Sequence, residues 1–275
     1  VYLMQDYGAP GMELEDLIPT WHLPMYMITI SQFLVDLVHQ YVEDRPIDLI
    51  PNTVDSEQFH APARGKSEVP TVGFLYRTEW VKGSDLVLAA VELARKEIPN
   101  LRLLAYGPRD KPGGKPPPKG MDYIVFPHND ELKEIYASCD VWLFASRREG
   151  FGLPILEAMA CRTPVIATPA GAAPELIAAQ GGGVMVDHED PVAMAREIVR
   201  FCSMEESEWI EVSDAALKTT VSRTWDQALG EFEESLIRAH KLDGRRAHLD
   251  QQDDVGDHRL MGAPGSRPHR NRPVL

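Results

Sequence analysis

Short runs of apolar and β-branched residues alternate along this chain with amphipathic stretches of roughly ten to fifteen residues. This alternation is typical of βαβ units, in which helices connect the parallel strands of one sheet. The apolar runs predict strands at 70–76, 101–106, 121–126, 140–145, 163–167 and 183–186. The stretches between them predict helices at 84–97, 130–137, 153–160, 174–179 and 191–202. We therefore expect an α/β fold built on a Rossmann-like, doubly wound parallel sheet.

A second, shorter αβ pattern precedes this domain. It predicts strands at 1–4, 26–30 and 47–50 and a helix from Gln32 to Tyr41 that is capped by Ser31. Because the chain enters an apolar run directly at Val1, we expect that most of this first domain lies upstream. The organisation that we predict is a truncated N-terminal domain at 1–45, an interdomain linker at 46–69, the main domain at 70–240 and a disordered tail at 241–275.

Two further helices and one loop complete the predicted elements. Helices are expected near 205–220 and 225–240, with Thr224 as a candidate cap of the second. The segment from Pro108 to Gly120 is too rich in proline and glycine for a helix, so it predicts an exposed loop at one rim of the sheet.

The charge of the chain narrows the function classes. The formal charge of −14, from 28 basic and 42 acidic side chains, repels phosphate backbones and anionic lipid headgroups. Nucleic-acid binding is therefore not expected, and any phosphate site has to be local. No apolar run reaches the roughly 18 residues that span a bilayer, and the start lacks a secretory pattern, so we expect a cytoplasmic protein. The three cysteines have no metal-type spacing and predict small buried thiols.

Candidate chemistry concentrates in the segment 146–157, SRREGFGLPILE, which follows a predicted strand and opens a helix. Gly150 and Gly152 let the backbone approach a ligand closely, and the free N–H groups at the helix start favour an anion. Glu149 and Glu157 flank those amides. A carboxylate accepts two strong hydrogen bonds from a diol, so sugar hydroxyls explain acidic groups beside a phosphate site. Taken alone, the same residues also fit a glycine turn with surface carboxylates.

Two cations follow the first strand of the main domain. Arg77 and Lys82 stand in the segment YRTEWVKG, directly after the predicted strand end at Tyr76. The carboxyl ends of parallel strands face one crevice, so both cations can face the carboxylates of the later segment. This arrangement suits a diphosphate, with lysine as a point charge and arginine as a fork. The alternative is that both are solvated loop cations.

These residues resemble the donor domain of glycosyltransferase family four, whose two-domain architecture is called the GT-B fold. The resemblance covers about 47 to 240 and rests on Glu149-x7-Glu157 within EGFGLPILEA, on the strand TPVIAT and on the turn from Gly171 to Glu175. It is supported by Arg77, by Lys82-Gly83 and by the linker from Ile50 to Asp55. The resemblance implies that the main domain is the C-terminal, donor-binding half of a GT-B protein.

The resemblance also implies a role for each candidate residue. Arg77 and Lys82 neutralise the diphosphate of a nucleoside diphosphate sugar, and Glu149 holds donor-sugar hydroxyls; these three form the expected catalytic set. The expected donor-binding set adds Glu157 at the ribose, the amides of Gly152 and Leu153 at the distal phosphate with Gly150 and Phe151 in the same loop, and Phe126 to His128 at the base. Transfer is expected to retain the anomeric configuration and to need no metal or other cofactor, because cations and a helix end stabilise the leaving diphosphate.

The chain also departs from the family pattern. Many relatives carry a histidine at the end of an acceptor-domain strand, where this chain has Gln5 and Asp6, so no catalytic histidine is carried over. The expected partner is a glycan or lipid-linked acceptor, in bacterial cell-surface polysaccharide synthesis. That acceptor leaves open a peripheral contact with the inner face of the cell membrane. Two alternatives also stay open: a non-catalytic nucleotide-sugar-binding fragment, and an epimerase with the GT-B fold.

Overall fold

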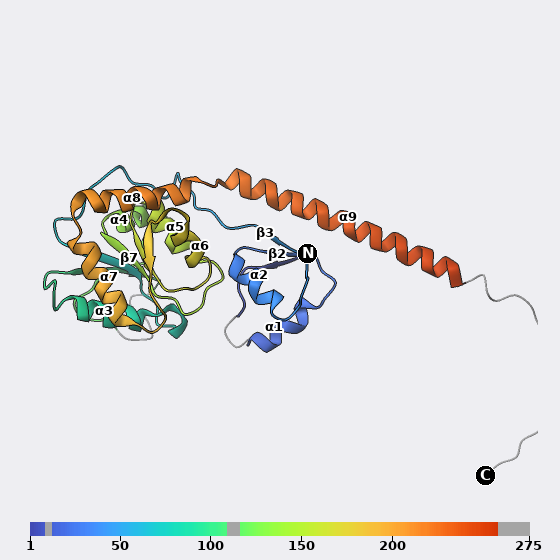
Figure 1. Ribbon diagram of the computed structural model, residues 1–275, viewed down its shortest axis with the longest axis horizontal. Helices are drawn as coiled ribbons and strands as arrows, with labels where there is room; N and C mark the ends of the chain where they lie inside the picture. Colours follow the sequence, from blue (N-terminus) through green and yellow to red (C-terminus); the bar gives the residue numbers. More distant parts are fainter. Residues whose placement is uncertain (9–12, 109–115, 258–275) are drawn as a thin grey trace, which may run out of the picture. The chain divides into compact units, whose positions relative to one another are not determined.

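A parallel sheet forms the centre of the main domain in the computed structural model, which describes residues 1–8, 13–108 and 116–257 (Figure 1). Its described strands are β4 (Thr71–Leu75), β5 (Arg102–Gly107), β6 (Asp122–Val125), β7 (Val141–Phe144), β8 (Val165–Ala167) and β9 (Gly183–Met185). They lie in the order β6-β5-β4-β7-β8-β9. This is the doubly wound order, in which the chain reverses direction across the sheet between β4 and β7. The predicted fold class and strands are confirmed.

Helices cover both faces of this sheet (Figure 1). One layer contains α3 (Ser84–Ala94) and α7 (Pro191–Ser203), and the other contains α4 (Asn129–Ala137), α5 (Leu153–Ala160) and α6 (Ala173–Gln180). A longer helix is α8 (Glu206–Val221). Its Trp209 is buried in the hydrophobic cluster of the α3 and α7 layer, and its Ala216 is buried in the cluster of the α4, α5 and α6 layer. The site described below lies at the ends of the strands between these two layers.

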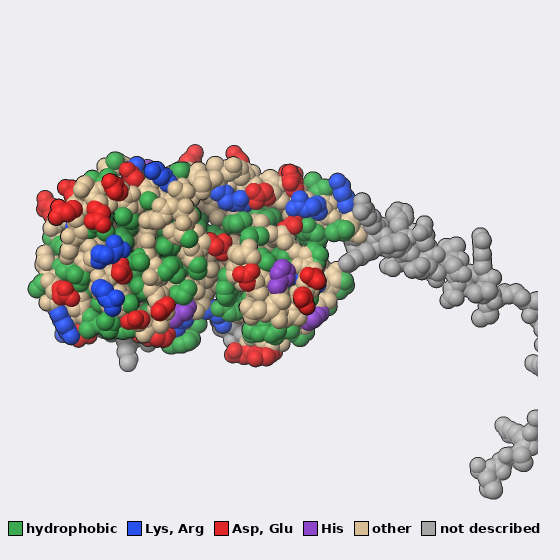
Figure 2. Space-filling model, in the orientation of Figure 1, with side chains coloured by type: hydrophobic (Ala, Val, Ile, Leu, Met, Phe, Trp, Pro, Cys, Tyr) green, Lys and Arg blue, Asp and Glu red, His purple; other side chains and the backbone are tan. Residues whose placement is uncertain are grey.

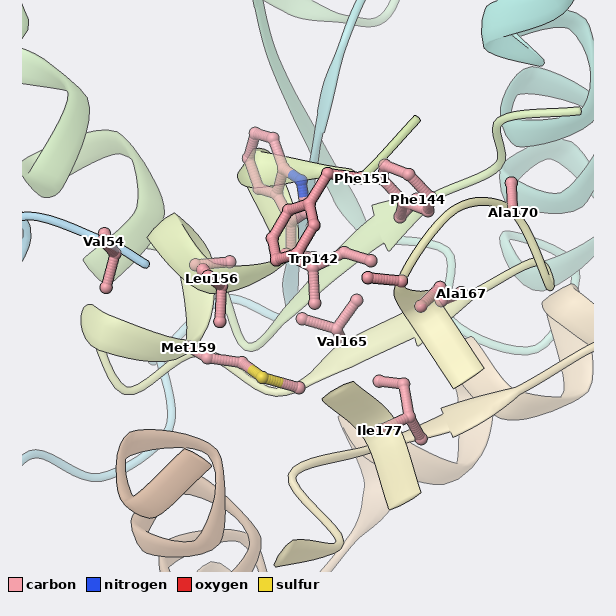
Figure 3. Packing of buried hydrophobic residues seen from close by; sticks show 14 of the residues in the cluster. Val54, Trp142, Phe144, Phe151, Leu156, Met159, Val165, Ala167, Ala170 and Ile177 are labelled. Atoms are coloured by element: carbon pink, nitrogen blue, oxygen red, sulfur yellow. The ribbon is translucent and has the colours of Figure 1, made fainter. Parts of the chain in front are cut away.

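The packing of α5 explains why the loop before it is held in place. Leu156 and Met159 on α5 are buried, and Figure 3 shows Met159 extending toward Val165 of β8. Phe151, directly before the helix, is also buried in this core. Burying a large apolar side chain contributes roughly 1.5–3 kcal/mol. The loop from Gly150 to Leu153 is therefore anchored through Phe151 and through the first turns of α5.

A small parallel sheet forms the N-terminal part of the chain. Its described elements are β1 (Tyr2–Met4), α1 (Leu14–Trp21), β2 (Met27–Thr29), α2 (Gln32–His39) and β3 (Ile47–Leu49), with strand order β1-β2-β3. Ser31 caps α2 as expected, since its side chain accepts a hydrogen bond from Leu34 N–H. The helix α1 was not predicted, because it carries Pro19 inside and begins after Glu13 instead of a favoured capping residue.

The predicted linker begins later than expected and is well packed. Because β3 pairs with β2, residues 47–49 belong to the N-terminal sheet, and the boundary that we placed at 46 is too early. After β3, the side chains of Val54 and Phe59 are buried. Arg64 donates hydrogen bonds to the Cys139 carbonyl and to Thr163 Oγ1, at 2.6 and 2.9 Å. The segment therefore lies along the main domain as an ordered strap.

The C-terminal helix differs most from the prediction. Thr224 caps α9 (Trp225–Asp257) as expected, accepting from Gln227 N–H at 3.3 Å. The helix continues through residues 241–257, which we predicted to be disordered. That prediction relied on the absence of apolar periodicity, whereas Leu, Ala, Arg and Gln in this segment favour a helix by intrinsic propensity. Residues 258–275 and most of the predicted loop at 108–120 lie outside the described residues.

The hydropathy of the described helices, the charges on one face and the cysteines can be compared with the sequence. None of the helices described contains a stretch long and apolar enough to cross a bilayer. On the face shown in Figure 2, acidic and basic side chains are interspersed. All three cysteines, Cys139, Cys161 and Cys202, are buried and unpaired, as predicted.

Candidate functional site

The reversal of strand order between β4 and β7 creates the crevice in which the candidate residues lie. Arg77 follows β4 directly, and a single 3-10 turn, η1 (Trp80–Lys82), carries Lys82 back over the sheet. Gly83 ends this turn with φ of 65°, and a Cβ atom there would lie 1.9 Å from the carbonyl oxygen of Ala145. Only glycine fits so close an approach. Lys82 is thereby placed against the segment that follows β7.

Lys82 and Glu149 meet in this crevice. Lys82 Nζ donates to Glu149 Oε1 at 2.7 Å, and the two side chains are 29% and 17% exposed. Ser146 Oγ donates to the same carboxylate oxygen at 2.8 Å. A cleft of about 340 Å³, which includes open solvent, is lined by Lys82, Ser146 and Glu149 and by the start of α5 at Pro154. The structure therefore brings one predicted cation and one predicted carboxylate together at the switch point.

The loop that opens α5 presents backbone N–H groups. Gly152 is the N-cap of the helix, with φ of 103° and no side-chain cap. Within the described residues, the N–H groups of Gly152 and Leu153 donate no hydrogen bond. Such free N–H groups, together with the positive end of the helix dipole, form an anion-binding position. The loop is fixed from the other side, because the N–H of Ala172 donates to the Phe151 carbonyl at 2.8 Å.

Arg77 and Glu157 are not among the residues that line that cleft, and Glu157 lies beside a pair of tyrosines. Tyr136 donates to Glu157 Oε2 at 2.5 Å, and its hydroxyl is 2.8 Å from that of Tyr106. Burial and the charge of Glu157 raise the pKa of Tyr106, whereas its hydrogen bond with Tyr136 and the charge of Arg77 lower it. Arg77 Nε is buried and has no hydrogen-bond partner among the described residues. A buried guanidinium donor of this kind suits an anionic ligand.

Burial shapes the protonation of Glu157. Desolvation raises the pKa of Glu157 above its ordinary value of 4.5, and the hydrogen bond from Tyr136 opposes this shift. The carboxylate is stabilised by one hydrogen bond within the protein, so its other oxygen keeps its capacity to accept from a diol.

In the segment Phe126 to His128, predicted to contact the base, two backbone N–H groups donate hydrogen bonds within the protein. The Phe126 N–H donates to the Gly107 carbonyl at 2.9 Å, and the His128 N–H donates to Glu131 Oε2 at 2.6 Å. His128 caps α4 with its side chain. Phe126 has φ of 45°, unusual for an aromatic residue, and its side chain is 71% exposed. The backbone N–H groups of Phe126 and His128 are thus occupied, while the aromatic side chain of Phe126 faces solvent.

Some residues around the site were not predicted. Ser146 follows the end of β7, and this position after a predicted strand is a signal that could have identified it from the sequence. Tyr106 lies at the end of β5 but carried no motif, and Tyr136 lies in the last turn of α4, where nothing in the sequence marks it. Ser31 was predicted as a cap, yet it also donates from Oγ to the Gly150 carbonyl at 2.7 Å. No group of three His, Cys, Asp or Glu residues suited to a metal occurs in the part of the chain that the structure describes.

Comparison with known proteins identifies the class. Residues 69–204 match the family described as glycosyl transferases group 1. The D-inositol 3-phosphate glycosyltransferase of Segniliparus rotundus is 30% identical over 66% of this chain and 45% of its own length. The C-terminal domain of a glycosyl transferase group 1 family protein from Francisella tularensis is 25% identical, with a TM-score of 0.53, over 62% of this chain and 97% of that domain.

The fold is shared more widely. The Anabaena protein HepE, solved with UDP-glucose, has a TM-score of 0.68 at 16% identity over 87% of this chain and 71% of its own. This chain is therefore the C-terminal, Rossmann-like domain of a GT-B protein, with a short N-terminal part. Over residues 69–204 its main domain is similar to the glycosyl transferases group 1. The chain spans about half the length of the curated relatives that it matches.

Proposed function

We propose that the protein is a retaining glycosyltransferase that takes its sugar from a nucleoside diphosphate sugar. The observation that carries the proposal is the pairing of Lys82 with Glu149 beside the unoccupied N–H groups of Gly152 and Leu153. A cation and a helix N-terminus suit a diphosphate, and a carboxylate held next to them suits the hydroxyls of the attached sugar. UDP-glucose, the ligand in the structure of the Anabaena protein, is of the same chemical class.

Each predicted residue takes a definite role in this proposal. Lys82 has three N–H donors, so it can bind a phosphate oxygen while it keeps its hydrogen bond to Glu149. Arg77 binds the diphosphate through its fork, and the amides of Gly152 and Leu153 bind the distal phosphate. Glu157 accepts hydrogen bonds from the ribose diol. The exposed ring of Phe126 offers an apolar surface to the base, with His128 beside it.

The chemical step that we propose uses these residues to stabilise the leaving group. As the bond between the anomeric carbon and the diphosphate oxygen breaks, negative charge grows on the leaving phosphate. Arg77, Lys82 and the start of α5 stabilise that charge without a metal. The acceptor oxygen forms its bond to the same face of the sugar, and its proton passes to the departing phosphate. Neither Glu149 nor Glu157 acts as a nucleophile in this scheme.

Donor binding is the first test. A thermal-shift panel of uridine, guanosine, adenosine and thymidine diphosphate sugars should identify one base, because a ligand stabilises the folded state by mass action. Calorimetry with that donor should then show binding that is weakened at least tenfold in the Arg77→Ala/Lys82→Ala variant. Equal binding by the double variant, or no binding by the unmodified chain, would contradict the proposal.

Product analysis is the second test and separates the alternatives. The whole protein, incubated with the selected donor and with glycan, lipid-linked or D-inositol 3-phosphate acceptors, should form a glycoside whose anomeric configuration matches the donor. Nuclear magnetic resonance of the products distinguishes the outcomes. An altered nucleotide sugar without acceptor would indicate an epimerase. Binding without any product would indicate a non-catalytic protein.

A further inference from the structure

Two buried tyrosines connect the ribose-side carboxylate to the core of the main domain. Tyr136 on α4 is fully buried, and its hydroxyl donates to Glu157 Oε2 at 2.5 Å. The hydroxyl of Tyr106, at the end of β5, lies 2.8 Å from that of Tyr136. Because the Tyr136 hydroxyl donates its hydrogen bond to the carboxylate, the Tyr136 oxygen accepts one from the Tyr106 hydroxyl. The hydrogen bonds therefore run in one direction, from Tyr106 through Tyr136 to Glu157.

The two rings are held rigidly. Tyr136 packs against Trp142 with ring centroids 4.4 Å apart, and it meets Phe59 of the linker strap edge-on at 6.1 Å. Tyr106 also stacks on Trp142, with ring centroids 5.8 Å apart. Burial raises the pKa of both phenols, so they remain protonated donors over the whole physiological range. The packed rings therefore fix the positions of both hydroxyl oxygens.

We propose that Tyr136, supported by Tyr106, is a positioning residue that fixes Glu157 for the ribose diol of the donor. This inference rests on the proposed function, because it takes Glu157 to be the ribose-binding group. Tyr136 occupies one carboxylate oxygen and so orients the other. A carboxylate in a fixed orientation loses less side-chain entropy when it accepts the two ribose hydroxyls. The fixed carboxylate therefore binds the diol more tightly than a freely rotating one would.

The discriminating test compares a ribonucleotide with its 2′-deoxy counterpart. UDP and 2′-deoxy-UDP, and GDP and 2′-deoxy-GDP, are titrated calorimetrically into the chain and into its Tyr136→Phe variant. The unmodified chain should prefer the ribonucleotide by about tenfold, as expected for one hydrogen bond to a charged group. Tyr136→Phe should reduce this preference to about threefold or less, chiefly by weakening the ribonucleotide. Tyr106→Phe should reduce it in the same direction and by less.

The ratio of the two affinities is measured within one variant, so a loss of folded protein cancels from it. Tyr26→Phe is the matched control, because Tyr26 also donates to a carboxylate, Asp48 Oδ2 at 2.7 Å, but within the N-terminal sheet. It should leave the ratio unchanged. A Tyr136→Phe variant that keeps the full preference overturns this inference alone. An unmodified chain that binds no nucleotide, or that binds the ribonucleotide and its 2′-deoxy counterpart equally, overturns the assignment of Glu157 to the ribose as well.

Discussion

Lys82 Nζ lies 2.7 Å from Glu149 Oε1, so the cation assigned to the diphosphate and the carboxylate assigned to the sugar form one ion pair. The pairing has two consequences for the cleft. Glu149 is neutralised where its side chain is largely buried, and Lys82 is held in the position from which it can reach a phosphate. The two side chains should therefore affect different parts of the donor when each is changed separately.

Glu149→Gln should separate sugar recognition from diphosphate recognition. The change removes a negative charge beside Lys82, so affinity for the nucleoside diphosphate alone should stay constant or rise. Affinity for the corresponding nucleotide sugar, relative to the diphosphate, should fall by about tenfold, because a hydrogen bond to a charged acceptor is lost. Calorimetry with both ligands measures this ratio. Lys82→Met is the matched comparison and should weaken both ligands alike. Equal weakening of both ligands by Glu149→Gln would remove the sugar-binding role of Glu149.

Glu157→Gln should stabilise the protein at neutral pH while it weakens nucleotide binding. Burial raises the pKa of Glu157 in the folded state above 4.5. The folded protein then holds the proton more tightly than the unfolded chain. The stability linked to that proton is fully present below the unfolded pKa and is lost as pH rises through the folded pKa. At pH 7 the buried carboxylate is therefore unfavourable, and an uncharged isostere removes this penalty.

Thermal unfolding of the two proteins between pH 4.5 and pH 8 provides the measurement. The Tm of Glu157→Gln should exceed that of the unmodified chain by a few degrees at pH 7, since about 1 kcal/mol corresponds to roughly 2–4 °C in a chain of this size. The difference should shrink toward acid, and taking it between two proteins cancels the titration of all other carboxylates. A difference that is independent of pH would show that the ionisation of Glu157 has no part in stability.

The sequence was most informative where local pattern and function coincide. Each strand of the main sheet is a short β-branched or apolar run, and such runs are recognisable without knowledge of their neighbours. Arg77, Lys82 and Glu149 follow β4 and β7, so the parallel topology alone predicted that they share one edge of the sheet. The pairing of Lys82 with Glu149 agrees with that expectation.

What the sequence could not indicate depends on contacts between distant segments. Tyr106 and Tyr136 meet only after β5 and α4 have packed, and neither carries a local signal. The extension of α9 beyond residue 240 follows from helix propensity, which an analysis of apolar spacing does not register. The helix α1 contains a proline and lacks a favoured cap, so its formation depends on packing, in which Trp21 is fully buried.

Ser31→Ala should destabilise the contact between the N-terminal part and the loop from Gly150 to Leu153, called the donor loop below. Ser31 Oγ donates to the buried Gly150 carbonyl at 2.7 Å and accepts from Leu34 N–H at 3.4 Å. Alanine removes both bonds, so the free energy of unfolding should fall by about 1–3 kcal/mol. Urea unfolding measures the change. Ser222→Ala, which removes only a local bond to the Thr219 carbonyl on the surface, should change it by less than about 0.5 kcal/mol. Equal effects of the two changes would mean that Ser31 contributes no more than a surface cap.

Gly150→Ala should be far more disruptive, because Gly150 is in direct contact with another backbone. A Cβ atom at position 150 would lie 1.8 Å from the carbonyl oxygen of Gln5. Backbone cannot move aside as the end of a flexible side chain can, so either β1 or the donor loop has to shift. We expect a loss of about 3 kcal/mol in the free energy of unfolding, at the upper end of the range for overpacked core sites. Nucleotide affinity should fall in parallel, since the same loop carries Gly152 and Leu153.

Gly230→Ala tests the same substitution at a position without such contact. Gly230 lies within α9, and a Cβ atom there would have no heavy atom within 4 Å. Alanine in a helix interior is favoured over glycine by about 0.8–1 kcal/mol, so this variant should be more stable than the unmodified chain and should bind nucleotide equally well. Urea unfolding and calorimetry on both glycine variants measure the contrast. If Gly150→Ala were as stable as Gly230→Ala, the close approach of Gln5 to the donor loop would have no energetic importance, and the N-terminal part could not be what holds that loop in its binding conformation.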